Sequence, residues 1–134
     1  MGLPQRYACL DFGNTDIKVA LFEQDELSSV KRFSSEKEMF GFLSCEMPVA
    51  VCSVRNESLG IELQSYFKSL TFINSNSKLP FHNSYATPQT LGIDRLCNAA
   101  ALSSKPLNGA KLAIDLGTCI KFDFLNSENY YLGG

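Results

Sequence analysis

The 134-residue sequence is poor in the residue types on which several common kinds of site depend. It has a single histidine, His82, which excludes a histidine-based metal cluster and a Ser-His-Asp triad. Its five cysteines are odd in number and include no Cys-x-x-Cys pair. This pattern favours buried, reduced thiols over disulfides or a zinc site.

The sequence also lacks a charge excess and a long apolar run. The formal net charge is -2, and Lys and Arg are mixed with Asp and Glu without a basic patch. We therefore expect no nucleic acid and no membrane as partner, and any anionic ligand must be held by a local site. No apolar run approaches membrane-spanning length, and the first residues lack the apolar core of a signal peptide. Together these features predict a cytoplasmic protein.

The apolar patterning predicts a globular α/β domain. Hydrophobic residues make up 45% and charged residues 19% of the chain, as in soluble domains. The patterns predict strands at 7–11, 17–23, 26–33, 49–54 and 71–73, helices at 35–43 and 57–70, a long loop at 74–90, a helix at 93–102, and strands at 111–115, 120–125 and 130–132. A meander followed by β-α-β crossovers predicts a mixed sheet flanked by helices, and the strand at 111–115 is expected to be buried.

An internal repeat occurs near the two ends of the chain. The first copy runs from Asp11 through Gly13, Asn14 and Thr15 to Lys18, and the second runs from Asp115 to Lys121. With Asn14 taken as an insertion, Asp, Gly, Thr, Ile and Lys line up. Each copy then consists of a strand, an Asp, a Gly-Thr turn and a returning strand. Because the pattern occurs twice, chance is a poorer explanation than it would be for a single copy.

Two interpretations of the repeated turn stay open. The backbone N–H groups around each Gly, with the Thr hydroxyl, can cradle phosphate oxygens, and the Asp can hold Mg²⁺. Two such hairpins could then clamp the phosphates of a nucleotide. Alternatively, they are ordinary hairpins in which Gly and Asp only satisfy the turns.

These residues resemble the type III pantothenate kinases. The segments at Asp11 and Asp115 resemble the two phosphate motifs of that family, the second ending at Asp123. Tyr85-x-x-Pro88-x-x-Leu91-Gly92-x-Asp94-Arg95 resembles the pantothenate-binding segment, and Gly133-Gly134 the opening of the next motif. The middle segment carries the most weight because it separates this family from other actin-like kinases.

The resemblance implies an actin-like, ribonuclease-H-like fold and ATP-dependent phosphorylation of pantothenate, the first step of coenzyme A biosynthesis. It implies ATP, Mg²⁺, a monovalent cation such as K⁺ or NH₄⁺, and a homodimer. It also implies roles for particular residues: Asp94 as catalytic base; Tyr85, Gly92, Asp94 and Arg95 in substrate binding; Asp11, Gly13, Asn14, Thr15, Lys18, Gly117 and Thr118 in ATP and phosphate binding; and Asp11 and Asp115 at the metal.

Some of these residues have simpler explanations. An acid such as Asp94 stabilises the first turn of a helix in any case, Arg95 could be a surface residue, and Tyr85 could cover the core. Lys121 stands where the family usually has Thr. It could reach substrate or phosphate, or point to solvent, and Lys18 at the matching place favours solvent.

The length of the chain shapes the expected domain organisation. The resemblance implies relatives roughly twice as long, since two complete domains of this fold need more residues than one domain contains. We expect residues 1–105 to form the first ribonuclease-H-like domain and residues 110–134 the opening hairpin of a second, truncated one. On this view the chain is a fragment.

Two other functions are considered. One is a non-catalytic regulatory or protein-binding member of the superfamily, like the Bvg accessory factor group. The other is a sugar or acetate kinase of the actin-like fold, which would explain the hairpins but not the segment from Tyr85 to Arg95.

Overall fold

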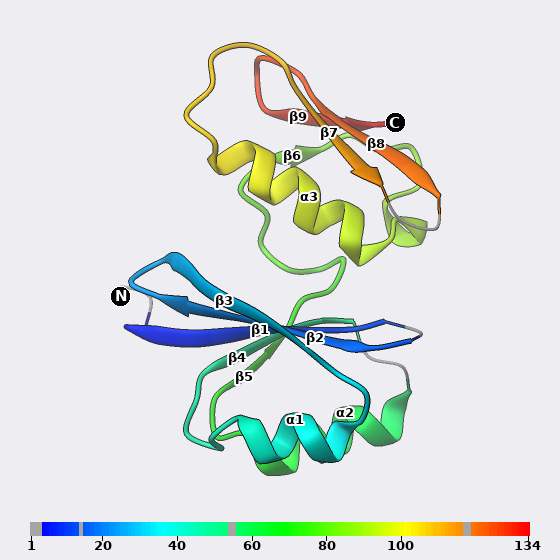
Figure 1. Ribbon diagram of the computed structural model, residues 1–134. Coiled ribbons are helices and arrows are strands. Elements are labelled where there is room, and N and C mark those ends of the chain that lie inside the picture. The colour runs from blue at the N-terminus through cyan, green and yellow to red at the C-terminus, as the bar shows by residue number, and fades with distance from the viewer. Residues whose placement is uncertain (1–3, 14, 54–55, 117–118) are drawn as a thin grey trace. The chain divides into compact units, whose positions relative to one another are not determined.

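The computed structural model describes residues 4–13, 15–53, 56–116 and 119–134. Contacts between residues divide the chain into two compact units, residues 1–73 and residues 74–134, each described here by itself (Figure 1). The expected division into a first domain of residues 1–105 and the opening hairpin of a second at residues 110–134 remains a prediction.

The first unit is a five-stranded mixed sheet. Its strands are β1 (Arg6–Phe12), β2 (Ile17–Glu23), β3 (Glu26–Phe33), β4 (Val49–Ser53) and β5 (Leu70–Phe72). The strand order is β3-β2-β1-β4-β5, in which β1, β2 and β3 form an antiparallel meander and β4 and β5 join in parallel. This arrangement confirms the expected meander followed by crossovers.

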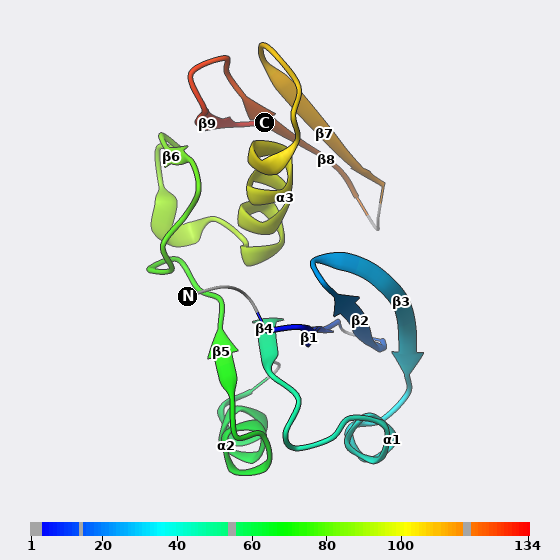
Figure 2. The same ribbon diagram turned by 90° about the vertical axis from the view of Figure 1, so that its left-hand side faces the viewer.

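Two helices, α1 (Glu36–Phe42) and α2 (Glu57–Tyr66), cover one face of this sheet in both views (Figure 1, Figure 2). The sequence predicts Ser34 or Ser35 as the N-cap of this helix, with Glu38 as the capping-box partner. The hydroxyl of Ser35 accepts from the N–H of Glu38, so the cap of α1 is Ser35. Met39 of α1 and Leu63 of α2 are fully buried against alternate residues of the central strands. The core of the first unit therefore lies between the helices and the sheet.

The predicted C-terminal end of the second helix was wrong. We expected helix to Leu70, but α2 ends at Tyr66 and Leu70 begins β5. The N–H of Phe67 closes the last turn on the carbonyl of Leu63, with Phe67 in an extended conformation. The apolar spacing continues past the helix because Phe67 and Leu70 join the same core from a non-helical segment.

The second unit is a four-stranded mixed sheet with one long helix against it. Its elements are β6 (His82–Asn83), the short 3-10 helix η1 (Pro88–Thr90), α3 (Ile93–Ser104), β7 (Lys111–Leu116), β8 (Ile120–Leu125) and β9 (Tyr130–Gly133). The order is β6-β9-β8-β7, antiparallel except for the parallel pair of β6 and β9. Two mixed sheets and three α-helices confirm the predicted α/β fold class.

The segment 74–90 was predicted as a loop, and this was only partly correct. It contains β6, which pairs in parallel with β9, and the 3-10 helix η1. The carbonyl of Pro80 also accepts from Asn129 Nδ2 at 2.8 Å and from the hydroxyl of Ser103 at 3.0 Å. These contacts tie the segment to both α3 and the sheet.

The sheet of the second unit turns its polar side chains toward the helix. Lys111, Asp115, Lys121 and Asp123 alternate with apolar residues along β7 and β8. The apolar residues of the opposite face are exposed: Leu112, Ile114, Leu116, Ile120, Phe122 and Leu132. The expectation of a buried strand at 111–115 was therefore wrong, because α3 packs on the face that carries the charges and leaves Leu112 and Ile114 exposed.

The five cysteines are free, as predicted, but they are not fully buried. Four are partly buried and Cys119 is exposed. Burial, with a smaller contribution from Cys52, raises the pKa of Cys9 to about 11, so its thiol stays protonated at neutral pH. Among the described residues, no helix has the length and hydropathy to cross a membrane.

The position of side chains on α2 predicts a contrast in stability. Leu63 is fully buried, whereas Ile61 on the same helix is 62% exposed. Leu63→Ala should lower the free energy of unfolding by about 2–5 kcal/mol because it removes packed methyl groups and leaves a cavity. Ile61→Ala is the matched control and should change it by less than about 0.5 kcal/mol. Urea denaturation measures both, and equal losses would contradict the assigned orientation of α2.

Candidate active site

The first repeated hairpin places an aspartate opposite a lysine. Asp11 near the end of β1 pairs across the ladder with Lys18 of β2, and their charged groups lie 3.9 Å apart. Both side chains are about half exposed. A Cβ on Gly13 would lie 3.2 Å from the carbonyl oxygen of Asp16, so the turn leaves little room for a larger residue. Thr15 is exposed beside it.

The second hairpin repeats this arrangement in detail. Asp115 of β7 is the cross-strand partner of Lys121 on β8, with Oδ2 and Nζ 3.7 Å apart. The two copies therefore share strand register as well as sequence. Asn14 of the first turn and Gly117 and Thr118 of the second lie outside the described residues.

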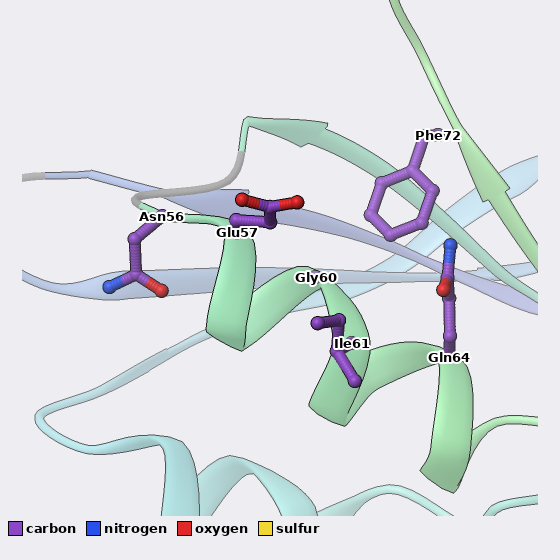
Figure 3. A pocket seen from close by; sticks show the side chains of 6 residues that line it. All are labelled: Asn56, Glu57, Gly60, Ile61, Gln64 and Phe72. Atoms are coloured by element: carbon purple, nitrogen blue, oxygen red, sulfur yellow. The ribbon is translucent and has the colours of Figure 1, made fainter.

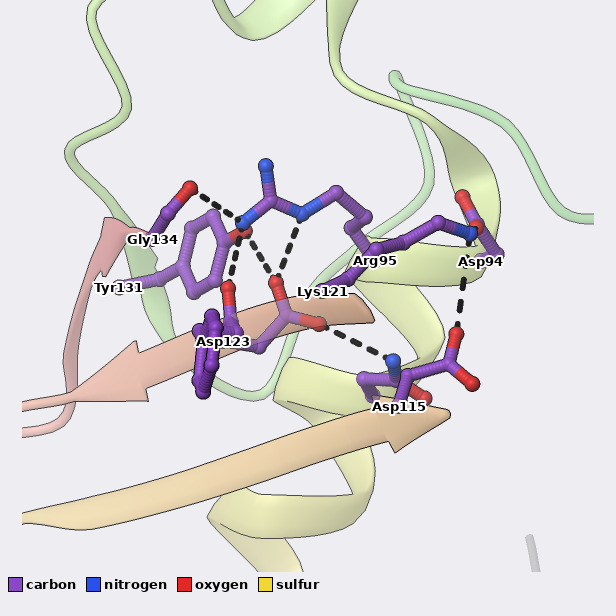
Figure 4. A network of polar contacts seen from close by, with 9 residues as sticks. Asp94, Arg95, Asp115, Lys121, Asp123, Tyr131 and Gly134 are labelled. Carbon is purple, nitrogen blue, oxygen red and sulfur yellow. Dashed lines mark hydrogen bonds and ion pairs between the residues drawn. The ribbon is translucent and has the colours of Figure 1, made fainter. Parts of the chain in front are cut away.

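The start of α3 faces the second hairpin. Asp94 lies in the first turn of α3, and its Oδ2 accepts a hydrogen bond from Lys121 Nζ at 2.5 Å (Figure 4). Lys121 thus stands between Asp94 and Asp115, and the interpretation that it points to solvent was wrong. The reason is that α3 covers the Lys121 side of β8, whereas Lys18 has only Asp11 as an ion-pair partner among the described residues.

These contacts determine the charge states of Asp94 and Lys121. Partial burial raises the pKa of Asp94, but the hydrogen bond from Lys121 and the backbone N–H groups of Arg95 and Asp94 lower it by more. The net pKa of Asp94 is lowered. The hydrogen bond to Asp94 and its negative charge raise the pKa of Lys121. Asp94 is therefore a carboxylate and Lys121 an ammonium at neutral pH.

Gly92 gives the Asp94 side chain its space. A Cβ at this N-cap position would lie within 2.4 Å of Asp94 Oδ1. No real side chain tolerates that separation, so any larger residue at Gly92 must move the carboxylate.

Arg95 lies next along α3 and bonds to the middle of β8 and to Gly134. Its Nε donates to Asp123 Oδ1 at 2.8 Å, and its Nη2 donates to the carbonyls of Phe122 at 2.7 Å and Gly134 at 3.2 Å (Figure 4). Its side chain is only 16% exposed, so Arg95 is not a free surface residue. Partial burial lowers the pKa of Arg95, but Asp123 raises it by more, and the guanidinium remains a cation.

Tyr85 joins the same group of residues. Its ring centroid lies 5.8 Å from the guanidinium carbon of Arg95 and 6.3 Å from the ring centroid of Tyr131. Gly133 has a positive φ of 91°, and a Cβ there would meet the Tyr85 ring at 2.7 Å. A glycine at 133 therefore lets the ring pack directly on the backbone.

The structure brings five predicted residues of the second unit together: Tyr85, Gly92, Asp94, Arg95 and Asp115. The remaining described residues of the prediction, Asp11, Gly13, Thr15 and Lys18, lie at the hairpin of the first unit. Their individual functional roles remain predictions.

This group also contains residues to which the sequence assigned no role. Asp123 accepts from Arg95, from the Tyr131 hydroxyl at 2.7 Å and from Asn98 Nδ2 at 3.0 Å, yet no role was assigned to it. The available signal was its position at the end of the segment that resembles the second phosphate motif. Tyr131 gave no signal. Asn98 closely follows the segment that resembles the pantothenate-binding motif, but its contact with Asp123 depends on how α3 packs.

A separate hollow lies beside α2 in the first unit (Figure 3). It is lined by Asn56, Glu57, Gly60, Ile61, Gln64 and Phe72. None of the predicted site residues is among them. The side chain of Asn56 is already used to cap α2 by accepting from the N–H of Leu59 at 2.9 Å. We assign no function to this hollow.

Comparison with known proteins identifies the family of this chain. Residues 8–134 match the family model of type III pantothenate kinase. Relatives of that name include proteins from Flavobacterium johnsoniae, 36% identical over 137 aligned residues, and Flavobacterium psychrophilum, 38% identical over 132. Each alignment covers 93% of this chain. The chain belongs to the type III pantothenate kinase family.

The chain spans about half the length of these relatives, 54% of the first and 55% of the second. A third relative, from Azobacteroides pseudotrichonymphae, is 35% identical and is covered to the same 55%.

The mixed α/β architecture is consistent with the actin-like fold that the sequence predicted.

The Lys121 contact predicts a titration shift. In Lys121→Met the carboxylate of Asp94 loses its hydrogen bond and counter-ion, so its pKa should rise toward the ordinary value of about 4. Carboxyl ¹³C NMR measures this pKa directly. Lys18→Met removes the matching lysine of the first hairpin and should leave the Asp94 titration unchanged.

The same pair defines a pH window for stability. The lowered pKa of Asp94 contributes stability above about pH 4, lost as pH falls through the folded-state pKa. The raised pKa of Lys121 contributes stability below about pH 10, lost as pH rises through its folded-state pKa. The stability difference between Lys121→Met and the unsubstituted protein should be flat between these limits and shrink outside them. An Asp94 pKa that is the same in Lys121→Met and in the unsubstituted protein would contradict the contact between Lys121 and Asp94.

Proposed function

We propose that the protein transfers the γ-phosphoryl group of ATP to the 4′-hydroxyl of pantothenate, the first step toward coenzyme A. The observation that carries the proposal is the paired carboxylate and guanidinium of Asp94 and Arg95 at the start of α3, each held by a partner on β8. The family membership of the chain supports the same reaction.

The two side chains suit the two ends of the acceptor. Asp94 takes the proton from the attacking hydroxyl, while the bond between the γ-phosphorus and the bridging oxygen of ATP breaks. A carboxylate with a lowered pKa is a weak base, which fits a loose transition state in which the proton leaves late. Arg95 binds the pantothenate carboxylate, for which a guanidinium is the matching cation. The Tyr85 ring lies beside the Arg95 guanidinium.

The repeated hairpins are proposed to bind ATP through their turns. Asp11 and Asp115 fit a Mg²⁺ role, because each is a partly exposed carboxylate at the end of a strand. Mg²⁺ is commonly held by one or two carboxylates and keeps waters and phosphate oxygens as its other ligands. Bound Mg²⁺ would neutralise charge on the phosphates. We propose further that the protein uses a monovalent cation, forms a homodimer and is located in the cytoplasm. We propose neither nucleic acid nor a membrane as its partner.

Replacing the proposed base tests this function. Asp94→Asn should lower kcat at least about 100-fold, because the amide cannot accept the proton, while the folded structure persists. Coupled measurement of ADP release with pantothenate gives kcat, and circular dichroism gives the melting temperature. Glu23→Gln, which weakens the exposed ion pair with Arg6, is the control and should leave kcat unchanged. Full activity in Asp94→Asn would exclude the proposed role.

The space at Gly92 gives a second test. In Gly92→Ala the new methyl group displaces the Asp94 carboxylate, and kcat should fall about 10- to 100-fold, as expected for a misplaced catalytic group. The change at the helix N-cap should cost only about 1 kcal/mol of stability. Gly41→Ala in α1, where the added methyl has open space, is the matched control. Equal kcat values in the two variants would show that the position of Asp94 does not matter.

A further inference from the structure

Asp123 stands out among the described residues as the one fully buried charged side chain. Both of its oxygens are used: Oδ1 accepts from Arg95 Nε at 2.8 Å and Tyr131 Oη at 2.7 Å, and Oδ2 accepts from Asn98 Nδ2 at 3.0 Å. An unpaired carboxylate in this position would be strongly destabilising, so these three donors are required to keep it there.

Stability alone does not explain a buried ion pair. Apolar residues of similar volume are often as stable or more stable at such places. What an ion pair with fixed hydrogen bonds provides is a defined orientation of both partners. The question is therefore which group Asp123 orients.

The hydrogen bonds identify the guanidinium of Arg95 as that group. Asp123 binds Nε, and the carbonyls of Phe122 and Gly134 bind Nη2. Nη1 has no acceptor within the described part of the chain, and Figure 4 shows one terminal nitrogen of the guanidinium turned away from Asp123. Three acceptors thus fix the plane of the guanidinium and leave one donor group for a ligand.

Tyr131 and Asn98 support Asp123 from two different elements. Tyr131 of β9 is fully buried, and its ring packs 5.8 Å from that of Phe81. Burial and the hydrogen bond to Asp123 raise the pKa of Tyr131, so its hydroxyl remains a donor. Asn98 lies one turn along α3 from Arg95. Asp123 is therefore held from the helix and from the neighbouring strand.

We propose that Asp123, held by Tyr131 and Asn98, is a positioning residue that fixes Arg95 so that its Nη1 group is presented to the carboxylate of the acceptor. Asp123 itself touches no substrate. This inference rests on the proposed function, because the acceptor carboxylate is that of pantothenate.

Calorimetry with pantothenate and NMR of the Arg95 Nε–H proton test the inference together. Tyr131→Phe removes one donor with almost no change in volume, and Asp123→Asn removes the charge. We expect the Kd for pantothenate to rise about threefold in Tyr131→Phe and about tenfold or more in Asp123→Asn, the range for lost neutral and charged hydrogen bonds. Exchange of the Nε–H proton with solvent should become faster in both. In kinetics, KM should rise more than kcat falls.

Tyr66→Phe is the matched control for a purely structural tyrosine. The Tyr66 hydroxyl donates to the carbonyls of Phe40 and Leu43, each at 2.9 Å, in the first unit. This variant should lose stability while its Kd for pantothenate stays unchanged. A Tyr131→Phe protein that loses stability in the same way and keeps its Kd would overturn the positioning role.

Failure of the proposed function gives a different result. If the unsubstituted protein does not bind pantothenate, the assigned substrate is wrong, and the positioning of Arg95 is judged by NMR. An Nε–H exchange rate that is the same in Asp123→Asn, in Tyr131→Phe and in the unsubstituted protein then overturns the positioning as well.

Discussion

The buried hydrogen bond between Arg95 and Asp123 is the interaction on which the arrangement of the second unit depends. It joins the first turn of α3 to the middle of β8 and so determines which residues of the two elements meet. With α3 and β8 aligned in this way, Asp94 lies opposite Lys121, and Tyr85 lies beside the Arg95 guanidinium. At the other end of α3, Lys111 donates to the carbonyl of Lys105 at 2.9 Å, where a cation stabilises the helix terminus.

The charges between α3 and its sheet explain the unusual distribution of polarity in this unit. A sheet normally turns its apolar residues toward the helix that covers it, whereas β7 and β8 turn Asp115, Lys121 and Asp123 that way. Large apolar residues such as Ile114 and Ile120 are left exposed on the opposite face. Fixed charges on the face that α3 covers fit the proposed binding of an acceptor that carries a carboxylate and a reacting hydroxyl.

The sequence predicted features that depend on local patterns, and it failed where distant segments decide. Ser35 capping α1 and the repeated hairpins follow from residues close together in the chain, and both the cap and the shared Asp-Lys register are present. The strand β6 could not be predicted, since its two residues pair only with distant β9. The face that β7 and β8 present to α3, and hence the contact of Lys121 with Asp94, depends on helix packing that periodicity does not encode.

We propose that Asp123 holds Arg95 toward the substrate carboxylate while Asp94 meets the substrate hydroxyl. A crystal structure of the protein with bound pantothenate measures this most directly. The account predicts the pantothenate carboxylate within hydrogen-bond distance of Arg95 Nη1, the Asp123–Arg95 bond retained, and the 4′-hydroxyl next to Asp94. Pantothenate bound away from Arg95, or a guanidinium that leaves Asp123 on binding, would contradict it.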